Sequence, residues 1–141
     1  MNIVDIKERL HDECVLNVIS YSQYMPTEEK LNKFADKCGS DSSISAFACE
    51  DNGFICGVIV LKHTGDTAFE IMSIATNPDY RKHGVASSLV SFAAGILKCS
   101  EIKAETDDDA VDFYHKYGFH IESLGEKYPG IIRYLCTLKL M

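Results

Sequence analysis

Two apolar segments joined by a tight turn constrain the fold of this chain more than any other feature of its sequence. The segments are ISAFACE (residues 44–50) and FICGVIVL (residues 54–61), and Asp51-Asn52-Gly53 separates them. Asn-Gly readily adopts the positive φ angles of a tight β-turn, so the pattern predicts an antiparallel hairpin. The longer segment has eight residues, far fewer than a membrane-spanning helix needs.

A strand, a helix and another strand are predicted to follow this hairpin. AFEIMSIAT (residues 68–76) is a strand that Asn77-Pro78 ends, because proline cannot donate to a β-ladder. EIKAET (residues 101–106) is a further strand, and a crossover of this kind indicates a parallel strand pair. The helix between them begins after Gly84, and its apolar face consists of Val85, Leu89, Phe92, Ala93, Ile96 and Leu97.

The first part of the chain is predicted to form a short strand at residues 2–7 and two helices. The first helix has apolar residues at i+4 spacing, namely Leu10, Cys14 and Val18. Thr27 is the expected N-cap of the second helix, because its hydroxyl can accept a free backbone N–H and two acidic residues follow it. Gly39 can end that helix, whose buried stripe would consist of Leu31, Phe34, Ala35 and Cys38.

The last part of the chain is predicted to add a short helix and further strands. AVDFYHKYGF (residues 110–119) forms the helix, which Gly118 closes, and IIRYLCTLKL (residues 131–140) alternates as a strand does. One face of that strand would carry Ile132, Tyr134, Cys136, Leu138 and Leu140. The predicted order is β, α, α, β, β, β, α, β, α, β, β. This order indicates one α/β (α+β) domain over residues 1–141, with a mixed, mainly antiparallel sheet flanked by helices.

The net charge and the N-terminal sequence limit the binding partners and the cellular location that we expect. A net charge of −7 argues against a nucleic-acid surface and favours cationic partners. Residues 101–112 hold six acids and one lysine, which could form either a solvated loop or part of a binding site. The N-terminus MNIVDIKERL has no apolar signal-peptide core, so we expect a cytoplasmic protein that does not bind membranes.

The six cysteines are scattered along the chain. They form no CxxC pair and have no metal-type spacing with the five histidines. We therefore expect reduced thiols, most of them packed as small hydrophobic groups, and no metal site.

The segment RKHGVA (residues 81–86) precedes the predicted amphipathic helix. The first turn of a helix presents unpaired backbone N–H groups and the positive end of the helix dipole, which together suit an anion. Gly84 leaves the backbone open to a phosphate, and Arg81 and Lys82 add positive charge. An ordinary loop with a solvated Arg-Lys pair explains the hexapeptide equally well.

With its flanking elements, RKHGVA resembles the Arg/Gln-x-x-Gly-x-Gly/Ala signature of the GNAT superfamily of N-acetyltransferases. A second segment, DDDAVDFYHKYGF (residues 107–119), is similar to the family pattern Asn-x-x-Ala-x-x-Phe-Tyr-x-x-x-Gly-Phe. The matching residues are Ala110, Phe113, Tyr114, Gly118 and Phe119. The predicted strand order is also that of the family, so the resemblance covers nearly the whole chain.

The resemblance implies that the protein binds acetyl-coenzyme A. In the family, the strand before the phosphate loop bulges and splays from its parallel neighbour, and pantetheine pairs with its backbone. Ile74, Ala75 and Thr76 occupy that position here. After Arg81, the pyrophosphate would lie on the backbone N–H groups of Lys82, His83, Gly84, Val85, Ala86 and Ser87.

Two positions of the second segment carry implied roles. Tyr114 matches the tyrosine that family members use as a general acid toward the departing thiolate, a role that requires hydrogen-bond reach. Core packing of a short aromatic helix is the alternative. Asp107 replaces the usual asparagine and cannot donate a hydrogen bond to coenzyme A, although it could cap the helix beginning near Asp108.

Glu70 is the candidate general base. A carboxylate within a buried strand is costly unless water, a partner or a cationic substrate reaches it. Its distance from Arg81 in the sequence is also similar to that of the catalytic glutamate in histone-type lysine acetyltransferases. The alternative is an exposed position on a twisted strand.

The implied function is transfer of an acetyl group from acetyl-coenzyme A to a primary amine, directly and in a ternary complex. The alternative is a non-catalytic module that binds or senses acyl-coenzyme A. The feature that supports this alternative is Asp107 in place of the usual asparagine. The acidic segment suggests a cationic acceptor such as a polyamine, a lysine side chain or an aminoglycoside. The final strand, if exposed, could pair two subunits into a homodimer.

Overall fold

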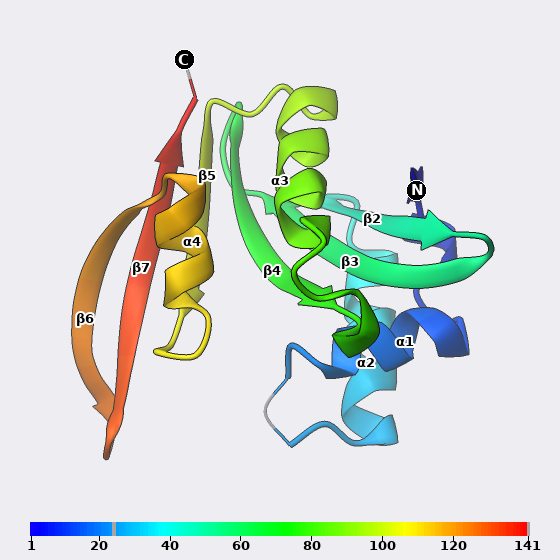
Figure 1. The fold of residues 1–141 in the computed structure, drawn as a ribbon, viewed down its shortest axis with the longest axis horizontal. Helices are drawn as coiled ribbons and strands as arrows, with labels where there is room; N and C mark the ends of the chain where they lie inside the picture. The colour runs from blue at the N-terminus through cyan, green and yellow to red at the C-terminus, as the bar shows by residue number, and fades with distance from the viewer. Residues whose placement is uncertain (24, 141) are drawn as a thin grey trace.

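The strands of the protein form one sheet, in which β4 and β5 are the parallel neighbours. The computed structural model describes residues 1–23 and 25–140. The strands are β1 (Asn2–Asp5), β2 (Ile44–Asp51), β3 (Phe54–His63), β4 (Ala68–Thr76), β5 (Glu101–Thr106), β6 (His120–Tyr128) and β7 (Ile131–Lys139). They lie in the order β1-β2-β3-β4-β5-β7-β6, and every pair except β4–β5 is antiparallel. The predicted fold class and element order are confirmed (Figure 1).

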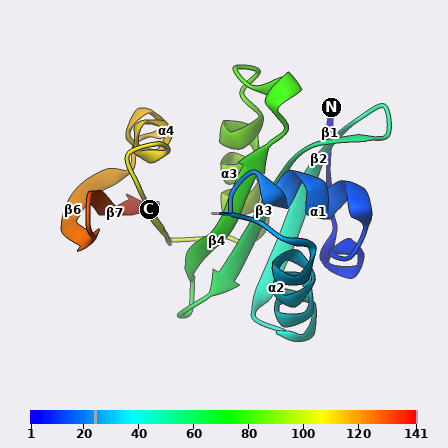
Figure 2. The same ribbon diagram turned by 90° about the horizontal axis from the view of Figure 1, so that it is seen from below.

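Helices cover both faces of this sheet (Figure 2). They are α1 (Glu13–Ser20), α2 (Glu28–Ser40), α3 (Val85–Ile96) and α4 (Val111–Tyr117), and the short 3-10 turns are η1 (Lys7–Arg9) and η2 (Pro78–Tyr80). Buried side chains of α1 and α2 form one apolar cluster with the sheet, and those of α3 and α4 form another on the opposite face. Within the described residues, no helix is long and apolar enough to cross a membrane.

The hairpin that opens the sheet has the predicted turn. Asn52 and Gly53 have φ angles of 50° and 85°, which match the turn geometry that favours Asn-Gly. The β3 strand that follows is buried over Ile55–Leu61. Its Gly57 lies directly under α3, because a Cβ at this position would be 2.5 Å from Val85 Cγ1. The missing side chain therefore lets the N-terminal turn of α3 rest on the sheet.

Both predicted helices, α1 and α2, are present, but the predicted start and apolar face of α1 are wrong. β1 ends at Asp5 and α1 begins only at Glu13, so Leu10 and Cys14 do not share a helix. Cys14 is exposed, and the buried face of α1 consists of Val15, Val18 and Ile19. The predicted cap of α2 is confirmed, since the Thr27 hydroxyl accepts a hydrogen bond from the Lys30 N–H.

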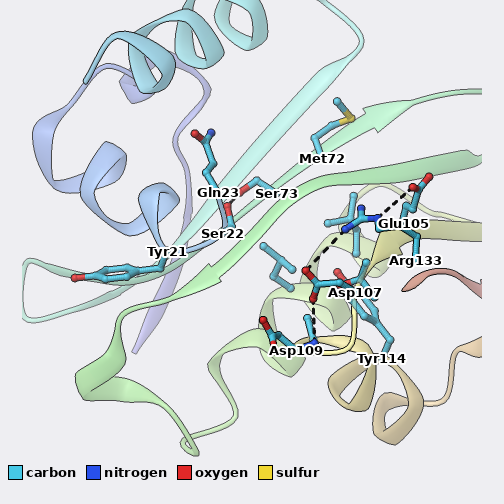
Figure 3. A pocket seen from close by; sticks show the side chains of 14 residues that line it. Tyr21, Ser22, Gln23, Met72, Ser73, Glu105, Asp107, Asp109, Tyr114 and Arg133 are labelled. Atoms are coloured by element: carbon cyan, nitrogen blue, oxygen red, sulfur yellow. Dashed lines mark hydrogen bonds and ion pairs between the residues drawn. The ribbon is translucent and has the colours of Figure 1, made fainter. Parts of the chain in front are cut away.

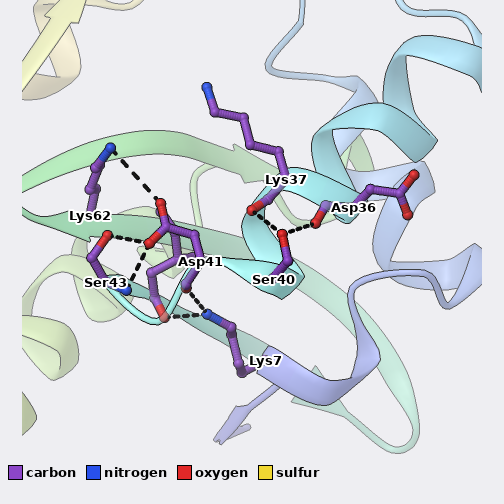
Figure 4. A network of polar contacts seen from close by, with 8 residues as sticks. Lys7, Asp36, Lys37, Ser40, Asp41, Ser43 and Lys62 are labelled. Carbon is purple, nitrogen blue, oxygen red and sulfur yellow. Dashed lines mark hydrogen bonds and ion pairs between the residues drawn. The ribbon is translucent and has the colours of Figure 1, made fainter.

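Gly39 does not end α2. The helix continues to Ser40, whose hydroxyl donates to the carbonyl of Asp36, and Asp41 follows in an extended conformation. Lys7 then donates to the carbonyls of Asp41 (2.6 Å) and Ile44 (2.7 Å). These contacts hold the end of α2 against the start of β2 (Figure 4).

The final strand is not an edge strand. β7 lies between β5 and β6, so its backbone is paired on both sides and the predicted basis for a homodimer is wrong. The edge of this half of the sheet is β6, most of whose residues are exposed.

Candidate functional site

A cleft opens where the two parallel strands separate. β4 pairs with β5 at only three positions, and the last pair is Glu70 with Lys103. Beyond it, residues 71–76 of β4 pair with β3 alone. Figure 1 shows the two strands diverging from this point. One edge of β4 therefore presents backbone groups that no strand of the described residues pairs, as the family resemblance implied.

A β-bulge in β4 changes which face each side chain occupies. Val60 of β3 pairs with Ser73 and Leu61 pairs with Ile71, so Met72 is an extra residue. Before the bulge, Ile71 belongs to the apolar cluster under α3. After it, Ala75 belongs to the cluster under α1 and α2. The bulge thus turns Ser73 and Ala75 to the face opposite Ile71, as an inserted residue does in a strand of period two.

A cavity of about 450 Å³ fills the cleft (Figure 3). The β4 wall is formed by residues 71–74, and the opposite wall contains residues from β5 and the loop that follows it. Tyr114 of α4 and Arg133 of β7 also contribute, and Tyr21, Ser22 and Gln23 approach from the loop after α1.

Tyr114 is the most buried titratable group in this cavity, with 4 % of its surface exposed. Its ring packs edge-on against Phe113 and Phe119, with centroids 5.1 Å apart in each case. Burial raises the pKa of its phenol above the ordinary range. The Tyr114 hydroxyl has no hydrogen-bond partner among the described residues. In that part of the chain, every fully buried side-chain oxygen has a hydrogen-bond partner, so the Tyr114 oxygen is not fully buried. The hydroxyl therefore reaches the space of the cleft, protonated and available to donate.

Three carboxylates and one guanidinium line the far wall. Arg133 lies between Glu105 (Nε to Oε1 3.4 Å) and Asp107 (Nη1 to Oδ2 3.9 Å). Partial burial alone would raise the pKa of Glu105, but hydrogen bonds from Lys127 and Arg133 hold this pKa below its usual range. Asp109 is the third carboxylate in the lining. This wall is therefore negative at neutral pH.

Asp107 closes the turn that leads into α4. Its Oδ1 accepts a hydrogen bond from the Asp109 N–H at 3.0 Å, and its carbonyl accepts from Val111 at 3.0 Å. The helix begins at Val111 with Ala110 as its N-cap, so Asp107 lies three residues before the cap position. Its side chain also lines the cleft.

The N-terminus of α3 opens into a second cavity farther along β4. This cavity of about 240 Å³ is lined by Thr76, Tyr80, Arg81, Lys82, Gly84, Val85, Ala86, Ser87 and Phe113. The first intrahelical hydrogen bond runs from the Ser88 N–H to the Gly84 carbonyl at 2.9 Å. The N–H groups of residues 85–87 consequently have no intrahelical partner. They are the expected anion-binding donors.

Gly84 is required for its backbone angle. Its φ is +74°, in the left-handed region, while a Cβ would have nothing within 4 Å. The space that a Cβ would occupy is open toward the cavity, so the role of Gly84 in leaving room for a phosphate stays a prediction. Lys82 also has a positive φ, of 68°.

Three of the predicted site residues lie outside these cavities. The side chain of Ala75 is buried in the apolar cluster under α1 and α2. His83 points to the other side of the loop, against Tyr80, with ring centroids 6.5 Å apart. Glu70 is exposed and lies in register with Lys62 and Lys103. Of the two interpretations of Glu70, the exposed position is the one observed, because the alternation of β4 places Phe69 and Ile71, not Glu70, in the core.

Sequence reasoning missed Ser22, Ser73 and Arg133. Ser73 was recognisable only as one polar residue in an apolar strand, and Ser22 lies in a loop with no motif. Among the described residues, no three His, Cys, Asp or Glu side chains are grouped so that they could hold a metal ion.

These features define a domain with a splayed parallel strand pair and a helix N-terminus at the same cleft. The sequence model of the Acetyltransferase (GNAT) domain matches residues 42–121, which is more than half of the chain. The protein belongs to the GNAT acetyltransferase family. No curated protein matches it in sequence.

Solved structures of several acetyltransferases share the fold. An aminoglycoside 6′-N-acetyltransferase complexed with coenzyme A has a TM-score of 0.78 at 15 % identity, covering 100 % of this chain and 98 % of that one. The ribosomal-protein-S18-alanine N-acetyltransferase from Escherichia coli has a TM-score of 0.75 at 16 % identity, with 98 % and 92 % covered. PaiA N-acetyltransferase from Thermoplasma acidophilum, in complex with coenzyme A, has a TM-score of 0.72 at 19 % identity, with 99 % and 100 % covered.

Proposed function

We propose that this protein transfers an acetyl group from acetyl-coenzyme A directly to a primary amine, with both substrates bound in the cleft. The observation that carries the proposal is the run of two cavities along the unpaired edge of β4. One cavity contains the Tyr114 hydroxyl and the other contains the N-terminus of α3. Coenzyme A in the complexes of similar folds is consistent with a ligand in this cleft.

The chain supplies binding groups to each part of acetyl-coenzyme A. The pyrophosphate would accept hydrogen bonds from the N–H groups of residues 85–87, with Arg81 and Lys82 adding charge. The pantetheine amides would pair with the free edge of β4 at Ile74 to Thr76. The thioester would then lie between β4 and Tyr114.

The acetyl transfer itself needs two proton movements. The amine nitrogen forms a bond to the acetyl carbonyl carbon, and the bond from that carbon to sulfur breaks. Tyr114 donates its proton to the departing thiolate and is left as a phenolate. The amine releases one proton through water, and Tyr114 regains a proton from water before the next cycle. Because burial favours the protonated phenol, Tyr114 is in the donating form across the physiological pH range. Positioning of the two substrates supplies much of the rate.

Glu70 is the proposed acceptor of the amine proton through water. It directly precedes Ile71, which lines the cleft, and its carboxylate is open to solvent. We expect Glu70→Gln to slow turnover at neutral pH and to recover part of the rate in alkali, where the amine is already neutral. The measurement is a pH–rate profile of both proteins, and an unaltered profile would assign proton removal to another group.

The acceptor is proposed to be cationic, such as a polyamine, a lysine side chain or an aminoglycoside. Glu105, Asp107 and Asp109 outnumber Arg133 in the cleft. Salt should therefore weaken acceptor binding, so the KM for 1,4-diaminobutane should rise several-fold between 0.02 and 0.5 M NaCl, on the order of what screening of exposed charges produces. A KM that is indifferent to salt would argue against electrostatic recognition.

Ligand-dependent thermal unfolding tests the cofactor, and a thiol-release assay tests the reaction. Acetyl-coenzyme A at about 100-fold over its Kd should add about 2.7 kcal/mol to the unfolding free energy, while ATP and NAD should not. A selective shift with thiol release on adding an amine supports the enzyme. A selective shift without any amine-dependent release would instead support the non-catalytic acyl-coenzyme A module, and no shift would refute both.

A further inference from the structure

The hydroxyl groups of Ser22 and Ser73 meet inside the cleft, 2.7 Å apart. Ser73 belongs to β4 and is 6 % exposed, and Ser22 belongs to the loop after α1. Both residues line the cavity that contains Tyr114 (Figure 3). Nothing in the acetyl-transfer scheme above uses this pair.

The β-bulge is what brings the two serines together. In a regular strand, Ser73 would lie on the same face as Ile71, in the apolar cluster under α3. The extra residue Met72 turns Ser73 to the opposite face, where α1 and its following loop pack. A buried hydroxyl is thereby placed at the point where β4 leaves β5.

The direction of the hydrogen bonds follows from their geometry. The Ser22 hydroxyl donates to the Ile19 carbonyl at 2.8 Å. A serine hydroxyl has one proton and two lone pairs, so Ser22 can only accept in its contact with Ser73. Ser73 is then the donor, and its own proton is used. Its oxygen faces any third partner as an acceptor.

The cleft thus carries a hydrogen-bond acceptor on its β4 wall and a donor, the Tyr114 hydroxyl, among the groups from α4. We propose that Ser73 holds the attacking nucleophile by accepting its N–H, and that Ser22 is a positioning residue that fixes the direction of the Ser73 hydroxyl. The inference rests on the proposed acetyl transfer and adds to it the group that orients the amine. Serine does not remove the proton at neutral pH; it directs the nitrogen lone pair toward the thioester carbon.

Two serine variants separate this role from a purely structural one. If the pair only ties the loop to β4, Ser22→Ala should reduce activity at least as much as Ser73→Ala, because it breaks the hydrogen bond to Ser73 and the one to the Ile19 carbonyl as well. If Ser73 holds the nucleophile, Ser73→Ala should lower kcat/KM for the nucleophile about 10-fold, the effect of one lost hydrogen bond, and Ser22→Ala should lower it much less. Ser73→Thr, which keeps the hydroxyl, should retain most of the activity.

The assay follows acetyl-coenzyme A consumption with two probe nucleophiles, hydroxylamine and 1,4-diaminobutane. Ser40→Ala is the matched control, because its hydroxyl also donates to a backbone carbonyl but lies at the end of α2. The Kd of acetyl-coenzyme A should be the same in all variants. A loss in Ser22→Ala equal to or larger than that in Ser73→Ala, or a Ser73→Ala enzyme as active as the wild type, would overturn the assignment.

Failure of the proposed function has a different signature. A wild-type protein that binds acetyl-coenzyme A but transfers acetyl to neither probe would refute both proposals together. An active wild type with an equally active Ser73→Ala variant would refute only the role of Ser73.

Discussion

The chemistry proposed for the cleft depends on how a few residues are placed. Tyr114 belongs to a short aromatic helix that would pack well with phenylalanine at this position, since Phe113 and Phe119 already contact its ring. What distinguishes the tyrosine is a hydroxyl at the edge of the cavity with no partner among the described residues. Because this hydroxyl is open to the cavity, it can donate to a ligand bound there.

Tyr114→Phe should therefore reduce kcat while leaving the fold and cofactor binding intact. General acid groups typically contribute 10²–10⁴-fold, so we expect a fall of about 10²-fold in kcat. The Kd of acetyl-coenzyme A should change little, because the ring remains. Steady-state kinetics and a binding titration check these two outcomes, and unchanged turnover would remove Tyr114 from the mechanism.

At the scale of the element, the stability of α3 depends on the backbone conformation at its two ends. Gly84 has a φ of +74° and Gly95 lies in the last turn of the same helix. Among the described residues, and apart from the chain neighbours and the helix's own backbone, no atom lies within 4 Å of a Cβ at either position. Crowding therefore plays no part at either glycine. The effect of adding a methyl group depends only on the backbone conformation.

The same substitution should have opposite effects at these two positions. Gly84→Ala should destabilise the protein by about 1–2 kcal/mol, because left-handed backbone is unfavourable for residues with a Cβ. Gly95→Ala should stabilise it by about 0.5–1 kcal/mol, since alanine favours helix. Urea unfolding of both variants tests this, and destabilisation by Gly95→Ala would show that the backbone argument is incomplete.

The sequence predicts the elements of this protein better than the details of its cleft. The hairpin turn and the cap at Thr27 are local features, and both are present as predicted. The bulge at Met72 has no local signal, because it results from how β4 meets β3. Glu70 differs, because the alternation of Phe69 and Ile71 around it already indicates an exposed position. Arg133, which contacts Glu105 from β7, is distant from it in sequence.

For the whole molecule, buried thiols connect stability to pH. All six cysteines are free, and five are buried. Burial raises the pKa of Cys38, Cys49, Cys56, Cys99 and Cys136. The folded state therefore keeps protons that the unfolded state loses above about pH 8.5. Stability is fully present below that pH and decreases as the pH rises.

The free energy of unfolding should accordingly be flat near pH 7 and fall above about pH 8.5. Each buried thiol can contribute a slope of up to about 1.4 kcal/mol per pH unit. Denaturant unfolding under reducing conditions at a series of pH values measures the slope. Cys136→Ala should reduce it, whereas Cys14→Ala, at the exposed cysteine, serves as the control. A slope unchanged by Cys136→Ala would contradict the argument.

The joint between β4 and β5 is also where we expect the molecule to flex. Three residue pairs connect the strands of the first half of the sheet to those of the second, whereas six connect β5 to β7. Rotation about the short joint would widen or narrow the cleft without breaking either half of the sheet. Any ligand that contacts β4 and α4 together would restrain that rotation, so occupancy of the cleft and rigidity of the whole domain should rise together.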